Sequence, residues 1–221
     1  MKKHKYSLTE YIRRYVMLVI GLFILAFGVA VSTRANLGTS PISCVPFILS
    51  LKMPYTMGEI TIAMHVVFIA LQIILLRKDY ELIQLLQLAI AFVFGCFTDF
   101  TLWMTSGIHA DSYLMQWILC LISCVIVAIG VYMEVKADVV MLAGEGLMTA
   151  ISRVFHIEFG KVKVGFDSTL VVIGTILSFC IFGKLLGVRE GTVAAALSVG
   201  IIVRFIGRHI SMLKWFNLIE N

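Results

Sequence analysis

Residues 24–41, ILAFGVAVSTRANLGTSP, and residues 126–146, IVAIGVYMEVKADVVMLAGEG, decide the fold because the second stretch repeats the pattern of the first. An offset of 102 residues (130 − 28) pairs Gly28 with Gly130. Five further pairs follow, the last after an insertion of three residues in the second half: Arg34 with Lys136, Asn36 with Asp138, Gly58 with Gly160, His65 with Asp167, and Gly95 with Gly200. This register predicts two structurally equivalent halves.

The composition indicates a membrane protein. Hydrophobic residues make up 60% of the 221 residues, and the mean hydropathy is +1.00. A soluble domain averages about 45–50% apolar residues. We therefore expect residues 1–221 to form a single membrane domain. The basic start leads into an apolar run that is too long for a signal peptide and lacks a small-residue cleavage site, so we expect no cleaved leader.

Six apolar runs are long enough to cross about 30 Å of hydrocarbon. They are Tyr15–Ser32, Ile60–Leu76, Leu82–Thr105, Tyr113–Met133, Phe166–Phe182 and Thr192–Ile206. Residues 15–106 and 113–208 then hold three spans each, and an odd number per repeat forces opposite orientations. The sequence predicts an all-α membrane protein with six transmembrane helices, arranged as two inverted three-helix repeats.

Each half also holds an apolar run that is too short to cross the membrane. Pro41–Lys52 and Ala143–Val154 are predicted to be re-entrant or broken helices, which protein or water must satisfy at membrane depth. Ser40 before Pro41 is typical of a helix start, with the Ser40 hydroxyl as the predicted cap and Pro41 with its φ preset for the helix. Ser7 with Glu10 predicts a capping box and a short helix before the first span. Residues 208–221 are expected to form an interfacial amphipathic tail.

The basic residues are distributed as a membrane topology requires. They concentrate before the first span and after the second, fourth and sixth spans. This positive-inside pattern predicts that both termini are cytoplasmic. The net charge of +5 is thereby explained by the topology and by contact with anionic headgroups of the lipid bilayer, so no nucleic-acid partner is expected.

The breaks before the short runs are the candidate binding sites. A helix start presents free N–H groups that suit a carboxylate, a phosphate or another anion. The alternative is that both breaks are capped turns at the membrane surface. Because the break recurs at the same place in both halves, a binding site is favoured. The candidate solute-binding residues are Arg34, Asn36, Gly38, Thr39, Ser40, Asp138, Gly144 and Glu145.

Charged residues inside spans are candidates for coupling or gating, because they are costly in a membrane. Asp99 and Arg204 occupy equivalent positions, and so do His65 and Asp167. We expect Arg34 to be the partner of Asp99. For Arg204, the alternatives are snorkelling to the headgroups or pairing with an inner carboxylate. His65 could titrate near neutral pH, or it could be bonded to a neighbouring helix. The candidate partners of Arg204 are Glu134, Asp138 and Glu145.

Motifs of soluble enzymes are absent from the sequence. There is no P-loop, GxSxG, HExxH or dinucleotide fingerprint, so neither an enzyme nor a cofactor is expected. An intramembrane enzyme would require Glu145 to converge with His65 or Asp99. The five cysteines are interpreted as buried thiols without a disulfide or a metal site. They are Cys44, Cys96, Cys120, Cys124 and Cys180.

The motifs LGTSP after the first span and GEGLM at the equivalent place resemble those of the YczE/YitT-type integral membrane proteins of bacteria. The resemblance extends from about Tyr15 to Arg208. By position, residues 38–41 match the first motif and residues 144–148 match the second. The resemblance implies a multi-span protein of the bacterial cytoplasmic membrane that is transporter-like and has no firmly assigned substrate.

Together these observations predict a secondary transporter or permease for a small polar or anionic solute that binds between the two repeats. Two alternatives remain open: a substrate-capturing subunit of an ATP-driven importer, and a non-transporting membrane scaffold or regulator. Ala26 and Ala30 form a face for close helix packing, which suits the importer-subunit alternative, and the sequence is also compatible with a homo-oligomer.

Overall fold

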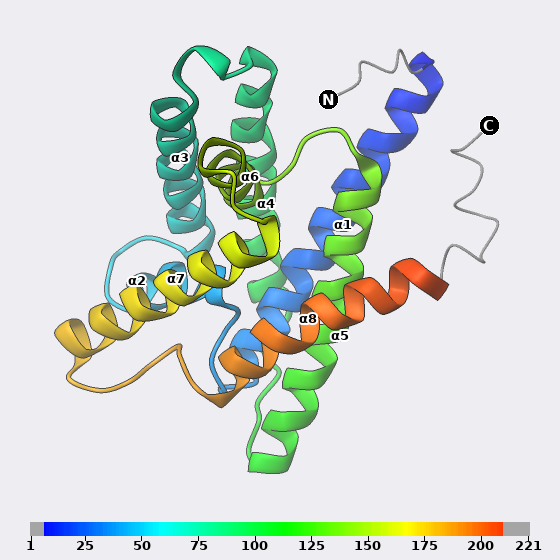
Figure 1. The fold of residues 1–221 in the computed structure, drawn as a ribbon. Coiled ribbons are helices and arrows are strands. Elements are labelled where there is room, and N and C mark those ends of the chain that lie inside the picture. The colour runs from blue at the N-terminus through cyan, green and yellow to red at the C-terminus, as the bar shows by residue number, and fades with distance from the viewer. Residues whose placement is uncertain (1–6, 210–221) are drawn as a thin grey trace.

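The computed structural model describes residues 7–209, and the regular structure in this part of the chain is entirely helical (Figure 1). Two 3₁₀ turns, η1 and η2, separate α3 from α4. The elements are α1 (Leu8–Arg34), α2 (Pro41–Ser50), α3 (Met57–Leu76), η1 (Arg77–Asp79), η2 (Leu82–Leu85), α4 (Leu86–Met104), α5 (Tyr113–Ala137), α6 (Ala143–Phe155), α7 (Phe159–Phe182) and α8 (Glu190–His209).

Six helices are long and apolar enough to cross a membrane, as expected: α1, α3, α4, α5, α7 and α8. The two short runs form α2, with 10 residues, and α6, with 13 residues. The helix starts keep the register of the sequence. Pro41 and Ala143 begin α2 and α6, and Met57 and Phe159 begin α3 and α7, so both pairs lie 102 residues apart (143 − 41 and 159 − 57).

The expectation for the N-terminal region is wrong. No separate short helix precedes the first span, because α1 is continuous from Leu8 to Arg34. The side chain of Ser7 makes no capping bond, and the carboxylate of Glu10 accepts hydrogen bonds from Arg14, with Nη2 at 3.2 Å. Of the expected tail, Arg208 and His209 are the last residues of α8, and the rest lies outside the described residues.

A close contact between α1 and α5 forms the centre of the molecule. Gly28 on α1 lies against Val127, and Gly130 on α5 lies against Leu25. A Cβ atom added to Gly130 would lie 2.6 Å from the backbone nitrogen of Leu25, and one added to Gly28 would lie 2.8 Å from that of Val127. The two backbones can approach this closely only because both positions lack a side chain.

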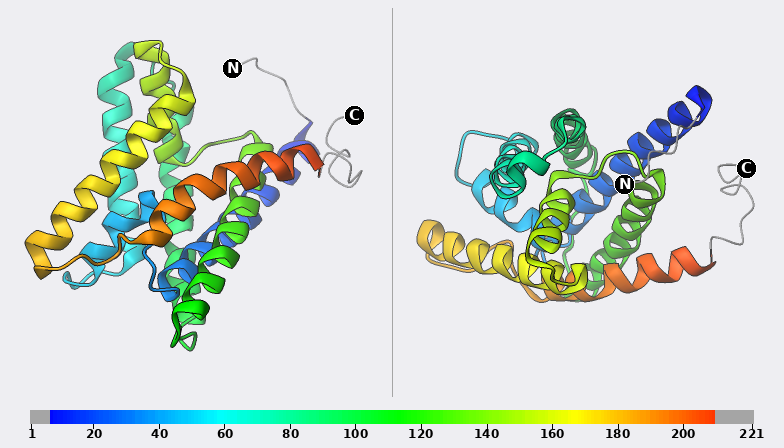
Figure 2. Two further views of the ribbon diagram at one scale, coloured as in Figure 1. Left: turned by 60° about the horizontal axis from the view of Figure 1, so that its bottom comes forward. Right: turned by 45° about the horizontal axis from the view of Figure 1, so that its top comes forward.

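The remaining helices pack around this pair in matching combinations. α4 packs on α1 and α8 packs on α5, while α2 packs on α7 and α6 packs on α3. One combination has no match: α3 and α4 pack along each other, but α7 and α8 diverge from the middle of the molecule toward opposite sides (Figure 1). Both views in Figure 2 show the same divergence.

The outer surface is strongly apolar, as expected for a protein that is surrounded by lipid. Ile74 on α3 and Trp103 on α4 are 67% and 71% exposed. The interpretation of all five cysteines as buried is wrong for Cys96 and Cys180, which lie on exposed faces of α4 and α7. An apolar face directed at lipid gains nothing from burial, so a thiol there needs no protein cover. The other three cysteines are buried, as expected.

We predict that Gly130→Ala lowers the melting temperature of the purified protein in detergent. Its Cβ would meet the backbone of Leu25, and overpacking of this kind costs about 1–3 kcal/mol. Gly165→Ala on α7 is the matched control, because nothing lies within 4 Å of its added Cβ, and alanine favours a helix. Equal melting temperatures of the two variants would contradict the close α1–α5 contact.

Candidate functional site

The first break lies between α1 and α2, and its backbone turns through two left-handed residues. Asn36 has φ 54° and Gly38 has φ 93°. Ser40 precedes the helix and Pro41 is its first residue, as expected. The hydroxyl of Ser40 does not cap the helix backbone but donates to the hydroxyl of Ser43 at 2.9 Å. The predicted helix start is thus confirmed, and the predicted side-chain cap is wrong.

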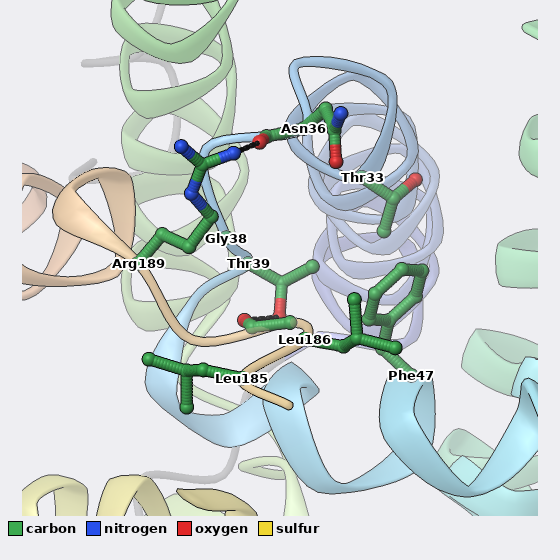
Figure 3. Close-up of a pocket in the computed structure, with 9 residues that line it drawn as sticks. Thr33, Asn36, Gly38, Thr39, Phe47, Leu185, Leu186 and Arg189 are labelled. Carbon is green, nitrogen blue, oxygen red and sulfur yellow. Dashed lines mark hydrogen bonds between the residues drawn. The ribbon is translucent and has the colours of Figure 1, made fainter. Parts of the chain in front are cut away.

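A pocket of about 240 Å³ lies at this break (Figure 3). The loop before α8 closes one side of it. The Thr39 N–H donates to the carbonyl oxygen of Gly187 at 3.0 Å, and the guanidinium of Arg189 donates to the carbonyl oxygen of Asn36 at 2.9 Å. The lining residues are Thr33, Asn36, Gly38, Thr39, Phe47, Leu185, Leu186, Gly187 and Arg189.

Three of the predicted solute-binding residues, Asn36, Gly38 and Thr39, line this pocket. Gly38 is required for space as well as for conformation, because an added Cβ would lie 2.6 Å from the backbone nitrogen of Arg189. Arg34 is not among the lining residues, and its guanidinium donates to the carbonyl oxygen of Leu102 at 2.8 Å. Arg189 supplies the cation instead. Arg189 is not among the candidate binding residues predicted from the sequence.

The second break, between α5 and α6, is acidic. Asp138 ends α5 with φ 48° and is exposed, whereas Glu134 is buried. One carboxylate oxygen of Glu134 accepts the Leu142 N–H at 2.8 Å, and the other has no hydrogen-bond partner among the described residues. Glu145, in the first turn of α6, interacts electrostatically with Glu134 and with Lys163. Two carboxylates therefore face one region near the start of α6.

Two buried glutamines, which sequence reasoning missed, lie next to the second break. The amide of Gln72 on α3 donates to the side-chain oxygen of Gln87 on α4 at 3.0 Å and to the Ala143 carbonyl oxygen at 2.9 Å. A Cβ added to Gly146 would lie 2.7 Å from the Gln87 amide nitrogen. The glycine of the GEGLM motif therefore makes room for the amide pair.

The starts of the two short helices meet in the interior. A Cβ added to Gly144 on α6 would lie 2.6 Å from Cδ1 of Ile42 on α2. His65 is buried nearby on α3 between two aromatic rings, with ring centroids 6.1 Å from Phe68 and 6.0 Å from Phe94. Its Nδ1 has no hydrogen-bond partner among the described residues.

Asp99 and Asp167 have partners that the sequence did not indicate. Asp99 accepts the Thr56 hydroxyl at 2.6 Å and the Gly58 N–H at 2.7 Å, so the expected pairing with Arg34 is wrong. Sequence position gave similar depths but not the direction in which each side chain points. Asp167 pairs with Lys163 at 3.1 Å.

Arg204 is exposed. Within residues 7–209 it forms no ion pair with the three carboxylates expected of it, Glu134, Asp138 and Glu145. The same part of the chain holds no group of three histidine, cysteine or acidic residues that could bind a metal ion.

A model of DUF6198, a family of unknown function, matches residues 12–208. A relative from Bacillus subtilis (strain 168), named "Uncharacterized protein YyaS", is 28% identical over 193 residues, which cover 79% of this chain and 91% of that protein. No solved structure matches the chain. These matches do not include the YczE/YitT-type proteins, so that resemblance stays a prediction.

We predict that Gln72→Leu destabilises the protein more than the double change Gln72→Leu/Gln87→Leu. The single change leaves a buried amide without its partner, at a cost of about 1–3 kcal/mol, whereas replacing both partners removes the unsatisfied group. Thermal unfolding of the three proteins in one detergent measures the difference. A double variant less stable than Gln72→Leu would contradict the described pairing.

Proposed function

This chain belongs to the DUF6198 family, and we propose that it is a secondary transporter for a small polar or anionic solute. The observation that carries the proposal is the pocket at the start of α2, where Arg189, Asn36 and Thr39 come together. The cavity at this place has a cation and hydrogen-bonding groups. Such a site suits a negatively charged or polar group.

An inverted repeat is part of the proposal and is supported by reciprocal contacts. Gly28 meets Val127 and Gly130 meets Leu25, and the two glycines and the two apolar residues are each 102 residues apart. Reciprocity of this kind is the signature of two-fold symmetry. For two antiparallel spans that cross the membrane, the axis lies in the membrane plane, which is the arrangement of many secondary transporters.

The proposed topology places both termini in the cytoplasm of a bacterial cell. The start of α1 and the end of α8 lie toward the same side in both views of Figure 2, which agrees with an even number of crossings. The positive-inside pattern then indicates that this side is the cytoplasmic one. In this topology α2 enters from the outer face and α6 from the inner face, as re-entrant helices whose starts meet at Ile42 and Gly144.

The two breaks differ in charge, and this difference suggests their roles. The outer break has Arg189 together with hydroxyl groups, so it would receive the negative group of a solute. The inner break has Glu134 and Glu145, which would take up a proton or a cation as the solute passes. Membership of the YczE/YitT type, with its transporter-like character, belongs to the same proposal.

We predict that a ligand of the outer pocket stabilises the wild type but stabilises Arg189→Gln much less. Loss of a charge-assisted hydrogen bond worth about 1.5–3 kcal/mol should raise the ligand concentration needed by roughly tenfold or more. The measurement is a thermal-shift screen with inorganic phosphate, sulfate, organic acids, amino acids, nucleobases and cations at several pH values. Lys184→Gln, an exposed change in the same loop, is the control.

Equal stabilisation of Arg189→Gln and the wild type would show that the pocket is not the binding site. A ligand that binds normally, together with an ATPase that co-purifies with the protein, would favour the importer-subunit alternative. Uptake of the identified ligand into proteoliposomes that contain this protein alone would support a secondary transporter.

A further inference from the structure

The helix packing of the two halves differs at one place, the contact between the second and third long helices of each half. In the first half, α3 and α4 pack closely through Gly58 and Gly95. A Cβ added to Gly95 would lie 2.8 Å from the Gly58 carbonyl oxygen. Asp99 on α4 holds this contact, because it accepts the Thr56 hydroxyl at 2.6 Å and the Gly58 N–H at 2.7 Å. In the proposed topology these residues lie near the outer face.

The equivalent surface of the second half is present but unused. Gly160 on α7 corresponds to Gly58, and Gly200 on α8 corresponds to Gly95. Nothing lies within 4 Å of a Cβ added to Gly200, and near Gly160 there is only the Glu158 carboxylate, at 3.9 Å. Val164, the equivalent of Ile62, which packs on Gly95, is 68% exposed. Figure 1 shows α7 and α8 running apart.

The chemistry that holds the first contact has a counterpart in the second. Glu158 precedes α7 as Thr56 precedes α3, and Arg204 stands where Asp99 stands. Where the first half has the hydrogen bond between Thr56 and Asp99, the second half therefore has two residues of opposite charge, Glu158 and Arg204. In this structure the Glu158 carboxylate lies 3.9 Å from Nζ of Lys161, and both side chains are exposed. An exposed ion pair of this kind contributes little to stability.

The loops show the same asymmetry. At the outer face the segment before α8 is bonded to the segment before α2. The Thr39 N–H donates to the Gly187 carbonyl oxygen at 3.0 Å, and the Gly191 N–H donates to that of Leu37 at 2.8 Å. At the inner face, no hydrogen bond among the described residues joins residues 138–142 directly to residues 77–86, and the Gln72 amide on α3 instead links Gln87 on α4 to the Ala143 carbonyl oxygen at the start of α6. The outer segments are therefore bonded to each other directly, whereas the inner ends are joined only through Gln72.

We propose that this structure is an inward-open state, and that α7 and α8 close on each other in the alternate, outward-open state. The closed inner contact consists of Gly160 against Gly200, with an ion pair between Glu158 and Arg204. The contact between α3 and α4 opens in exchange, because two equivalent halves that swap conformations produce alternating access. This inference rests on the proposed transport function and topology, and it identifies the residues of both gates.

The test is disulfide cross-linking in membranes of a protein whose five native cysteines are replaced. Glu158→Cys/Arg204→Cys is oxidised, and the product is digested with trypsin, which cleaves at Lys184 and Arg189 between the two sites. We expect linked peptides within one chain. Thr56→Cys/Asp99→Cys, whose native side chains touch, is the positive control.

Two further variants make the test specific. Val172→Cys/Leu197→Cys is the negative control, because these residues are 56% and 67% exposed on the same two helices but lie outside the proposed contact. Asp99→Ala should speed cross-linking of the inner pair about tenfold, the effect of a shift of about 1.4 kcal/mol, because it removes the bonds that fasten the outer contact.

Two results would overturn the inference. One is cross-linking of the inner pair no faster than that of the negative control, in membranes where the outer pair cross-links. The other is linkage only between two chains, which would make this surface an interface between copies. The proposed solute site and the proposed closure of α7 on α8 can be disproved independently. Ligand binding that depends on Arg189 does not require α7 and α8 to close.

Discussion

The contact between α1 and α5 at Gly28 and Gly130 is the constraint on which the rest of the structure depends. Apolar side chains gain nothing from leaving lipid for one another, so close backbone packing has to hold these helices together. A Cβ at either position would meet the backbone of the partner helix. Because α4 packs on α1 and α8 packs on α5, the contact also holds these two helices in place.

The interior around this contact is polar where the two halves correspond. Ser32 and Glu134, 102 residues apart, are both buried, and each has a side-chain oxygen without a hydrogen-bond partner among the described residues. Nδ1 of His65 is also buried and has no hydrogen-bond partner among the described residues. Buried polar atoms are costly when they lack partners, which favours a path for a solute or water over a dry scaffold. In the proposed topology, the outer end of such a path would be basic at Arg189 and the inner end acidic at Glu145.

Hydropathy was sufficient to predict the six spans, and length together with Gly38 and Pro41 was sufficient to predict the short helices. These features are local, so the sequence carries them directly. Arg189 could not be predicted as a pocket residue, because it lies in a loop and follows Asn36 by 153 residues (189 − 36). The partner of Asp99 was mispredicted because depth along a helix does not give the direction of a side chain. The amide pair was missed because each glutamine stands alone in an apolar run.

The central claim is that the two halves cross the membrane in opposite orientations, and accessibility of equivalent positions tests it most directly. Lys52 and Val154 are exposed, lie at the ends of α2 and α6, and are 102 residues apart (154 − 52). Each is changed to cysteine in a cysteine-free protein, and intact cells are treated with a membrane-impermeant maleimide. We predict that Lys52→Cys is labelled in intact cells, whereas Val154→Cys is labelled only after permeabilisation. Labelling of both positions from the same side would contradict the account.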